Sequence, residues 1–365
     1  MSSMRVLMWI NSGAEIPGGH RVQLQQTAKA LRALGVEVDE HDGPTLPTGT
    51  WDIVHGFQLG AVDVAQARRR GLPVALSTIY VGLTYSTSSD ARTTLRGGAG
   101  RVYRGLRHLG ASLRGRDALS RLAFRESEDQ LDRIRAWSMA DALLPNADGE
   151  ARHIREDLGV LTETVVVPNA IDVDLFAPGV DHDRPEGSVL CVGRIEPHKN
   201  QLGLIETLRG VPGITLTVVG PPHPHHAGYV ERCRAAATDN VAFLPGVDHE
   251  DLPSLYARHH THVLASWYET TGLVSLEAAA SGCTVVTTDR GHAPEYFLDD
   301  AYYCDPADAS SIRTAVAQAL ASGPSSRLRE RIAEQYTWAE TARLTLEAYE
   351  RVVHQRRGPF HTVER

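Results

Sequence analysis

Lysine is nearly absent from this chain of 365 residues, which contains only Lys29 and Lys199. Arginine carries the rest of the positive charge. Each remaining lysine is of interest, because a compact ammonium group is difficult to replace by a guanidinium at a crowded phosphate site. The formal net charge of −8 argues against general nucleic-acid binding, which needs a basic surface.

Long apolar runs are absent as well. The first run ends at Ile10 and is too short for a signal peptide or a membrane span, so we expect a cytoplasmic protein. The four cysteines have no C-x-x-C spacing, and we expect buried free thiols. No G-x-G-x-x-G follows a predicted strand, which weighs against an oxidoreductase that uses a dinucleotide.

Short apolar runs alternate with amphipathic helical stretches along the whole chain. This pattern is typical of α/β units on parallel sheets. The strands predicted for a first sheet are Val6–Ile10, Ile53–His55, Val74–Ser77, Ala142–Leu144 and Thr164–Val167. Those predicted for a second are Val189–Val192, Thr215–Val219, Val241–Leu244, His262–Leu264 and Thr284–Thr287. Helices are predicted near the C-terminus at Ala309–Ala321, Ser325–Gln335 and Trp338–Val353.

The fold predicted from this order is α/β, with two facing Rossmann-like domains and a cleft between them. The first domain comprises residues 1–168 and the second residues 188–337. Residues 169–187 are rich in turn formers and acids and are interpreted as an interdomain crossing. A last helix, at about 338–358, is expected to pack back on the first domain. Ligands of such folds bind at the carboxyl ends of the strands, so functional residues are expected in the loops after strands.

Two glutamates stand eight positions apart in the stretch from Ser266 to Glu277. Glu269 lies in a predicted loop, and Glu277 lies two turns into the apolar helix that follows. The start of a helix suits an anion because its free N–H groups point outward. Two carboxylates beside an anion site can accept hydrogen bonds from sugar or ribose hydroxyls. Taken alone, the pair could also belong to a solvated helix.

Two cationic side chains, Arg194 and Lys199, follow the predicted strand Val189–Val192. They lie five residues apart in a loop that begins with Gly193. Arginine as a planar fork and lysine as a point charge can clamp a diphosphate between them. The alternative is a loop whose charges are simply solvated.

Together, the Gly-Arg-x-x-x-x-Lys loop and the Glu-x7-Glu segment resemble the donor-binding domain of family 4 glycosyltransferases, which have the GT-B fold. The resemblance extends over most of the chain. It includes segments similar to the family's glycine loop, its interdomain crossing, its nucleobase-contacting turn and the sequence after the second glutamate. These segments are Pro17–His20, Val167–Asp172, Phe243–Val247 and Ala280–Val286.

The resemblance implies a role for each matching residue. Arg194 and Lys199 would neutralise the charge on a leaving nucleoside diphosphate, so that neither a metal nor another cofactor is needed. Glu269 would contact the donor sugar and Glu277 the ribose hydroxyls. The other donor-binding residues implied are Gly18, Gly19, Gly193 and Val247, together with the N–H groups of Thr271, Gly272 and Leu273.

The implied reaction is transfer of a hexosyl unit with retention of configuration, from a UDP-sugar or, as the next choice, a GDP-sugar. The acceptor, bound by the first domain, would be a glycan, a lipid-linked molecule or a small molecule. The leaving phosphate itself would deprotonate the acceptor, which relies on positioning and charge stabilisation. The alternatives are a sugar-nucleotide epimerase or phosphorylase of the same fold, and a catalytically silent, glycan-binding partner subunit.

The first domain departs from the family pattern at the reacting centre. Many family members have a histidine after the strand equivalent to Pro73–Thr78, where this chain has Tyr80. Tyr80 either supplies a hydroxyl there or packs in the core. His20 and His55, predicted in loops after strands, are the other candidates for contact with the reacting groups.

Residues 92–125 contain nine arginines and a single acid, Asp117. Such a segment could dock on an anionic membrane surface, which would place the protein at the inner face of the membrane. It could equally contact an anionic acceptor or have a structural role. Two further signals, Asp172-x-Asp174 and the histidine cluster from His223 to His226, are interpreted as a turn and a surface loop and not as metal sites.

Overall fold

The computed structural model describes residues 3–11, 19–81, 128–177 and 184–357. It divides into two compact units. The first unit is formed by Met1–Val167 together with Thr341–Arg365, and the second by Pro168–Glu340. The chain therefore crosses from one unit to the other twice, after Val167 and again after Glu340.

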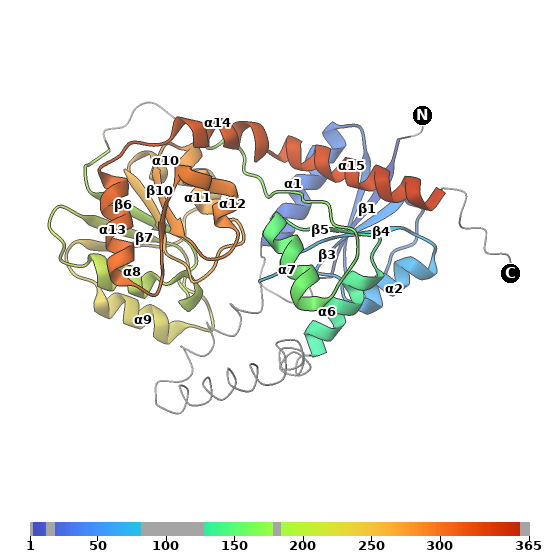
Figure 1. Ribbon diagram of the computed structural model, residues 1–365, viewed down its shortest axis with the longest axis horizontal. Coiled ribbons are helices and arrows are strands. Elements are labelled where there is room, and N and C mark those ends of the chain that lie inside the picture. Colours follow the sequence, from blue (N-terminus) through green and yellow to red (C-terminus); the bar gives the residue numbers. More distant parts are fainter. Residues whose placement is uncertain (1–2, 12–18, 82–127, 178–183, 358–365) are drawn as a thin grey trace. The chain divides into compact units, whose positions relative to one another are not determined.

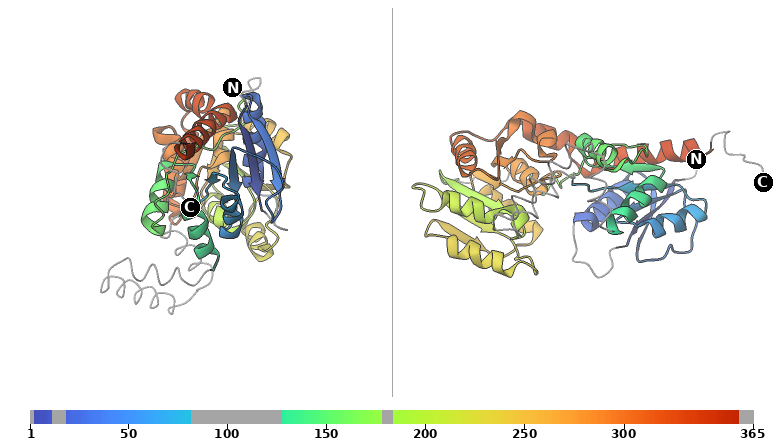
Figure 2. Two further views of the ribbon diagram at one scale, coloured as in Figure 1. Left: turned by 90° about the vertical axis from the view of Figure 1, so that its right-hand side faces the viewer. Right: turned by 60° about the horizontal axis from the view of Figure 1, so that its bottom comes forward.

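The first unit contains a five-stranded sheet in the order β2-β1-β3-β4-β5, in which every pair of neighbours is parallel. Its blue strands run side by side in Figure 2. The strands are β1 (Arg5–Ile10), β2 (Glu37–Asp42), β3 (Ile53–Phe57), β4 (Val74–Ser77) and β5 (Ala142–Leu144). The helices are α1 (Gly19–Ala33), α2 (Ala61–Arg69), α6 (Glu128–Met139), α7 (Asp148–Leu158) and α15 (Trp338–Arg357).

Both faces of this sheet are buried, as the continuous apolar character of β1 requires. Val6, Met8 and Ile10 point to one face and pack with residues of α1 and α15. Leu7 and Trp9 point to the other face, which α2, α6 and α7 cover. Figure 1 shows α15, in dark red, lying along the first unit near α1 and β1, although it is the last helix of the chain.

The second unit contains a six-stranded parallel sheet in the order β11-β10-β9-β6-β7-β8. Its strands are β6 (Ser188–Val192), β7 (Thr215–Val219), β8 (Val241–Leu244), β9 (Thr261–Leu264), β10 (Thr284–Thr288) and β11 (Tyr302–Cys304). Its helices are α8 (Gln201–Leu208), α9 (Ala227–Ala236), α10 (Leu252–Ala257), α11 (Leu273–Ala280), α12 (Ala293–Phe297), α13 (Ala309–Leu320) and α14 (Ser326–Gln335). Short 3₁₀ turns are η1 (Pro197–Lys199), η2 (His249–Asp251) and η3 (Leu298–Asp300).

The order of the strands in this sheet fixes where a ligand can bind. Helices α8, α9 and α13 pack on one face through a single apolar cluster, and α11 packs against β9 and β10. The first strand, β6, lies in the middle: β7 and β8 follow on one side, and β9, β10 and β11 on the other. The strand order therefore reverses between β6 and β9, and ligands of doubly wound sheets bind at the carboxyl ends of the strands at such a point.

The two Rossmann-like α/β units agree with the predicted fold class, and the differences concern single elements. The prediction missed β2, because Glu37–Asp42 is an acidic edge strand without apolar alternation, and it missed the short strand β11. It was wrong about Thr164–Val167. Only Thr164 of that segment forms a bridge, with Leu143, so the segment is not a regular strand.

Part of the segment after Val167 belongs to the second unit. Ile171 forms a bridge with Thr337, and the Phe176 side chain is fully buried. Arg184 donates hydrogen bonds to the carbonyl oxygens of Ser281 and His259. These contacts tie the described parts of the expected crossing into one folded body.

All four cysteines are free and buried, as predicted. Among the helices of the described residues, none combines the length and the apolar character that a bilayer crossing requires.

Candidate functional site

Two loops of the second unit meet at the carboxyl ends of β6 and β9. These strands are direct neighbours, with Leu190 opposite His262 in register. The loop after β6 carries Arg194 and Lys199, and the loop after β9 carries Glu269 and leads into α11. The predicted site residues of the two loops therefore lie at the point where the strand order reverses.

The loop after β6 is held in one conformation by its own backbone. Gly193 has φ +150°, and Ile195 forms a bridge with Pro222 in the loop after β7. The turn η1 then ends at Asn200, whose φ of +55° is in the left-handed region and whose side-chain amide donates to the carbonyl of Pro306. Lys199, the last residue of η1, is thereby placed on a fixed support.

An ion pair joins the two loops. The Lys199 ammonium lies 2.7 Å from Oε1 of Glu269, and the Glu269 side chain is only 7% exposed. A second link is formed by the backbone, because the N–H of Trp267 donates to the carbonyl of His198 at 2.9 Å. Charge pairing and backbone bonding together fix the distance between the lysine and the glutamate.

Arg194 has no such counterion. Among the residues that the structure describes, no carboxylate lies within ion-pair distance of its partly exposed guanidinium group. Its backbone carbonyl accepts a hydrogen bond from the side chain of Gln201 at 2.8 Å, which anchors the main chain and leaves the charged group available. An exposed guanidinium beside a sheet's ligand-binding end can bind an anion.

The start of α11 offers backbone donors. Gly272 has φ +80°, and the helix begins at the next residue. Within the described parts of the chain, the N–H groups of Thr271, Gly272 and Leu273 have no backbone acceptor. The Thr271 hydroxyl is held by the side-chain amide of Asn169 at 3.0 Å, and the N–H of Asn169 donates to the Tyr296 hydroxyl.

The predicted ribose-binding residue, Glu277, is held on both of its oxygens. Nε2 of His249 lies 2.9 Å from Oε1, and the Tyr256 hydroxyl lies 3.2 Å from Oε2. The Glu277 side chain is 9% exposed, and that of His249 is 58% exposed. Sequence reasoning missed His249 and Tyr256, since they match no motif of fixed spacing.

The environment of His249 is acidic. Its hydrogen bond to Glu277 raises the pKa of the imidazole above its ordinary value, against the opposing effect of partial burial. The charges of Glu277, Asp172 and Glu250 act in the same direction as the hydrogen bond. Protonated His249 is therefore favoured in the folded protein.

This shift predicts a pH-dependent contribution to stability. A raised folded-state pKa means that His249 stabilises the fold fully below its unfolded pKa of about 6.5, and that this contribution is lost as the pH rises through the folded pKa. We expect His249→Gln to lower the free energy of unfolding more at pH 6 than at pH 9, measured by urea denaturation. The control is His354→Gln, a substitution of an exposed histidine. If His249→Gln lowered the free energy of unfolding equally at both pH values, the assignment would be contradicted.

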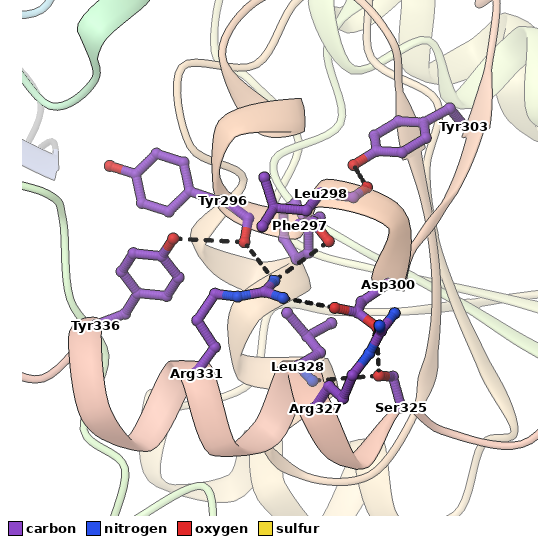
Figure 3. Close-up of polar contacts among 10 residues, drawn as sticks. All are labelled: Tyr296, Phe297, Leu298, Asp300, Tyr303, Ser325, Arg327, Leu328, Arg331 and Tyr336. Carbon is purple, nitrogen blue, oxygen red and sulfur yellow. Dashed lines mark hydrogen bonds and ion pairs between the residues drawn. The ribbon is translucent and has the colours of Figure 1, made fainter.

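A charged cluster, drawn in Figure 3, joins Asp300 of η3 to α14 and to Ser325 at its start. The Asp300 carboxylate accepts hydrogen bonds from Arg327, Arg331 and Ser325. Arg331 also donates to the carbonyl oxygens of Tyr296 and Phe297, at the end of α12. Because the Tyr296 hydroxyl accepts a hydrogen bond from the N–H of Asn169, whose side chain holds Thr271, this cluster supports the loop that leads into α11.

The contact between Asn169 and Thr271 could have been predicted from the sequence, whereas the Asp300 cluster could not. The predicted crossing motif contains Asn169, so a search for its partner within the second unit could have found Thr271. Nothing in the sequence around Asp300 marks it, because its partners come from a helix about 30 residues later.

In the first unit, two histidine positions were predicted wrongly. His55 lies inside β3 and not in a loop, where its ring nitrogens contact Tyr349 at 2.6 Å and Ser77 at 2.9 Å. Burial lowers the pKa of His55 to about 3, so the residue is a neutral part of the core. His20 lies in α1, and burial, with the nearby Arg133, lowers its pKa to about 4. Its Nδ1 has no hydrogen-bond partner in the described structure.

The structure argues against Tyr80 as a group at the reacting centre. Its side chain is 2% exposed, and its hydroxyl lies 3.2 Å from the Asp157 carboxylate of α7. Its ring packs edge-on against Trp137, and its N–H donates to the buried Glu150. Of the two readings of this residue, the structure supports packing.

Other predicted positions are less informative. Gly18 and residues 92–125 lie outside the described residues, and Gly19 is the first residue of α1. Val247 follows β8 and is 37% exposed. His223 lies 3.8 Å from Glu196, but no group of three or more metal-binding side chains occurs in the parts of the chain that the structure describes.

Comparison with known proteins places this geometry in context. The profile of the family described as "Glycosyl transferases group 1" matches residues 176–337. The chain is 28% identical over 235 residues to a glycogen synthase of Mycobacterium tuberculosis, a match that covers 60% of this chain and 57% of that protein. It thus spans little more than half the length of this relative. It is 25% identical to a D-inositol 3-phosphate glycosyltransferase of Mycolicibacterium smegmatis, over 93% of this chain and 88% of the other.

Solved structures share the fold at low sequence identity. A sucrose-phosphate synthase of Thermosynechococcus elongatus aligns with a TM-score of 0.73 at 17% identity, over 96% of this chain and all of the other. Anabaena HepE in complex with UDP and glucose aligns with a TM-score of 0.65 at 14% identity, over 94% and 99% of the two chains.

Proposed function

We propose that this chain is a glycosyltransferase of the GT-B fold and that it moves a hexosyl unit from a nucleotide sugar to an acceptor bound by the first unit. We propose further that transfer retains the configuration of the sugar and needs no metal. The observation that carries the proposal is the Lys199–Glu269 ion pair at the point where the strand order reverses, in a loop whose Arg194 has no counterion among the described residues.

The charges of these two loops fit the task of holding a diphosphate. A lysine ammonium has three N–H donors, so Lys199 can keep its bond to Glu269 and still donate two to phosphate oxygens. Arg194 adds a planar fork for the same group, and the N–H groups of Thr271, Gly272 and Leu273 add neutral donors. Such fixed donors stabilise the charge that develops on the leaving diphosphate in the transition state.

The two glutamates contact the sugar and the ribose of the donor, one each. Glu269, held beside the lysine that binds the diphosphate, contacts hydroxyls of the sugar. Glu277, four residues after the start of α11, contacts hydroxyls of the ribose. The leaving phosphate takes the proton of the acceptor hydroxyl, so the protein supplies positioning and charge instead of a base. His20 is neutral at pH 7, and its Nδ1 has no hydrogen-bond partner among the described residues, so it remains a candidate for contact with the reacting groups.

A thermal-shift screen of the purified chain against UDP, GDP, ADP and TDP tests the donor class. Binding at about 100 times Kd adds about 2.7 kcal/mol of stability, which corresponds to a rise of roughly 5–10 °C in the Tm of a unit as large as the second one, Pro168–Glu340. We expect the largest rise with UDP, a choice that the UDP complexes of HepE support. If none of the four nucleotides raises the Tm, the proposal is wrong.

Incubation of the chain with UDP-glucose and no acceptor separates the remaining readings. Slow release of UDP with free glucose indicates a transferase that uses water as a poor acceptor. Formation of sugar 1-phosphate in the presence of phosphate would indicate a phosphorylase, and a changed nucleotide sugar would indicate an epimerase. Binding without any turnover, with or without glycans, would indicate a silent partner subunit.

A further inference from the structure

The contact between His249 and Glu277 joins a surface turn to the buried end of the candidate donor site. His249 is the first residue of η2, and Glu277 lies in α11, 28 positions later in the chain. None of the roles assigned above uses the histidine.

The position of the imidazole is fixed although more than half of the side chain is exposed. Its ring packs edge-on against Phe176, with centroids 5.1 Å apart and an interplanar angle of 74°. Phe176 is fully buried and also packs against Tyr256, whose hydroxyl contacts the other oxygen of Glu277. One aromatic residue thus supports both hydrogen-bond partners of the carboxylate.

The hydrogen bonds leave part of the carboxylate free. A carboxylate has two oxygens and about four lone-pair positions. His249 takes one position on Oε1, and Tyr256 takes one on Oε2. Among the described residues, one position on each oxygen therefore remains, and two adjacent acceptors match the two neighbouring hydroxyls of a ribose.

We infer that His249 is a positioning residue for the donor: together with Tyr256 it fixes the plane of the Glu277 carboxylate, so that both oxygens face the ribose diol. This inference rests on the proposed function, because it takes Glu277 as the residue that binds the ribose. A positioning residue differs from a plug, that is, a residue that occupies the place of the ribose and competes with it for Glu277. It also differs from a purely structural contact, which would support the fold without affecting recognition of the ribose.

The test combines a change in the protein with a change in the ligand. Binding of UDP and of 2′,3′-dideoxy-UDP is measured by calorimetry for the wild-type chain and for His249→Ala. We expect His249→Ala to weaken UDP binding about fivefold, the worth of one hydrogen bond, while dideoxy-UDP binding changes by less than about twofold. The wild-type preference for UDP over dideoxy-UDP therefore shrinks in the variant.

Two further variants make the result specific. His249→Gln places an N–H donor near the position of Nε2, so it should restore most of the UDP affinity. His354→Ala, an exposed histidine in α15, should leave both affinities unchanged. In turnover of UDP-glucose, His249→Ala should raise KM and leave kcat nearly constant, because the contact is made in the ground state and the transition state alike.

Each other outcome overturns the inference. Tighter UDP binding by His249→Ala would identify His249 as a plug. Equal losses for UDP and dideoxy-UDP, or no loss for either, would reduce the contact to a structural one. If the wild-type chain bound no nucleoside diphosphate, the proposed function would fail first and the inference with it, so the two failures can be told apart.

Discussion

Lys199→Ala is expected to lower the rate of UDP release from UDP-glucose by about 10²–10³-fold, the usual cost of removing one preorganised donor from a developing negative charge. The substitution removes the ammonium that lies 2.7 Å from Glu269. It also leaves that carboxylate buried and without its cation, so repulsion of the donor phosphates adds to the loss. The effect should fall mainly on kcat, because charge on the leaving group is largest in the transition state.

The sequence supplies an unusually direct control for this experiment. Lys29, the only other lysine of the chain, is exposed on α1, and Lys29→Ala should leave the rate unchanged. A thermal melt of Lys199→Ala must accompany the kinetics, because loss of folded protein would also lower the rate. A folded Lys199→Ala variant with wild-type turnover would refute the assigned role and favour the silent-partner reading.

Asp300→Ala is expected to destabilise the second unit by about 3 kcal/mol, the usual cost of removing one partner of a buried ion pair. The Asp300 side chain is 4% exposed, and its oxygens accept from Arg331 at 2.6 Å and from Arg327 at 2.7 Å. Within the described chain, alanine would leave Arg331, itself 17% exposed, with only the carbonyl oxygens of Tyr296 and Phe297 as hydrogen-bond partners. The measurement is urea denaturation of the full chain.

Arg327→Ala is the matched control for this loss. Arg327 is 71% exposed, and removing an exposed partner of a salt bridge should cost less than about 1 kcal/mol. Asp300→Asn should fall between the two, because it keeps one acceptor oxygen and loses the charge. A loss for Asp300→Ala no larger than that for Arg327→Ala would show that the cluster in Figure 3 does not hold α14 in place.

The Asp300 cluster also makes the stability of the fold depend on pH in the acidic range. Burial alone would raise the pKa of Asp300, but hydrogen bonds from Arg327, Arg331 and Ser325 lower it below its ordinary value. A lowered folded-state pKa means that the stabilisation is present above the unfolded pKa of about 3.9 and is lost as the pH falls through the folded value. The difference in the free energy of unfolding between the wild type and Asp300→Asn should therefore become smaller at strongly acidic pH.

Most strands could be read from the sequence because they are buried on both faces. A continuous apolar run such as Val6–Ile10 is distinctive in any parallel sheet, whereas the edge strand β2 is partly solvated and carries acids. The error at His55 arose because the local sequence does not show which side chains pack around a residue. A histidine next to an apolar run resembles a loop residue, and only the packing of Ser77 and Tyr349 around it shows that it lies in the core.

The sequence by itself determined the α/β class, and it placed Arg194, Lys199, Glu269 and Glu277 in or after loops that follow strands. Periodicity and local spacing carry that information, because each depends on neighbours along the chain. Only the tertiary structure decided that β6 and β9 are adjacent, so that Lys199 meets Glu269. It alone decided that His249 meets Glu277 and that the Tyr80 side chain is buried, since long-range packing leaves no periodic trace in the sequence.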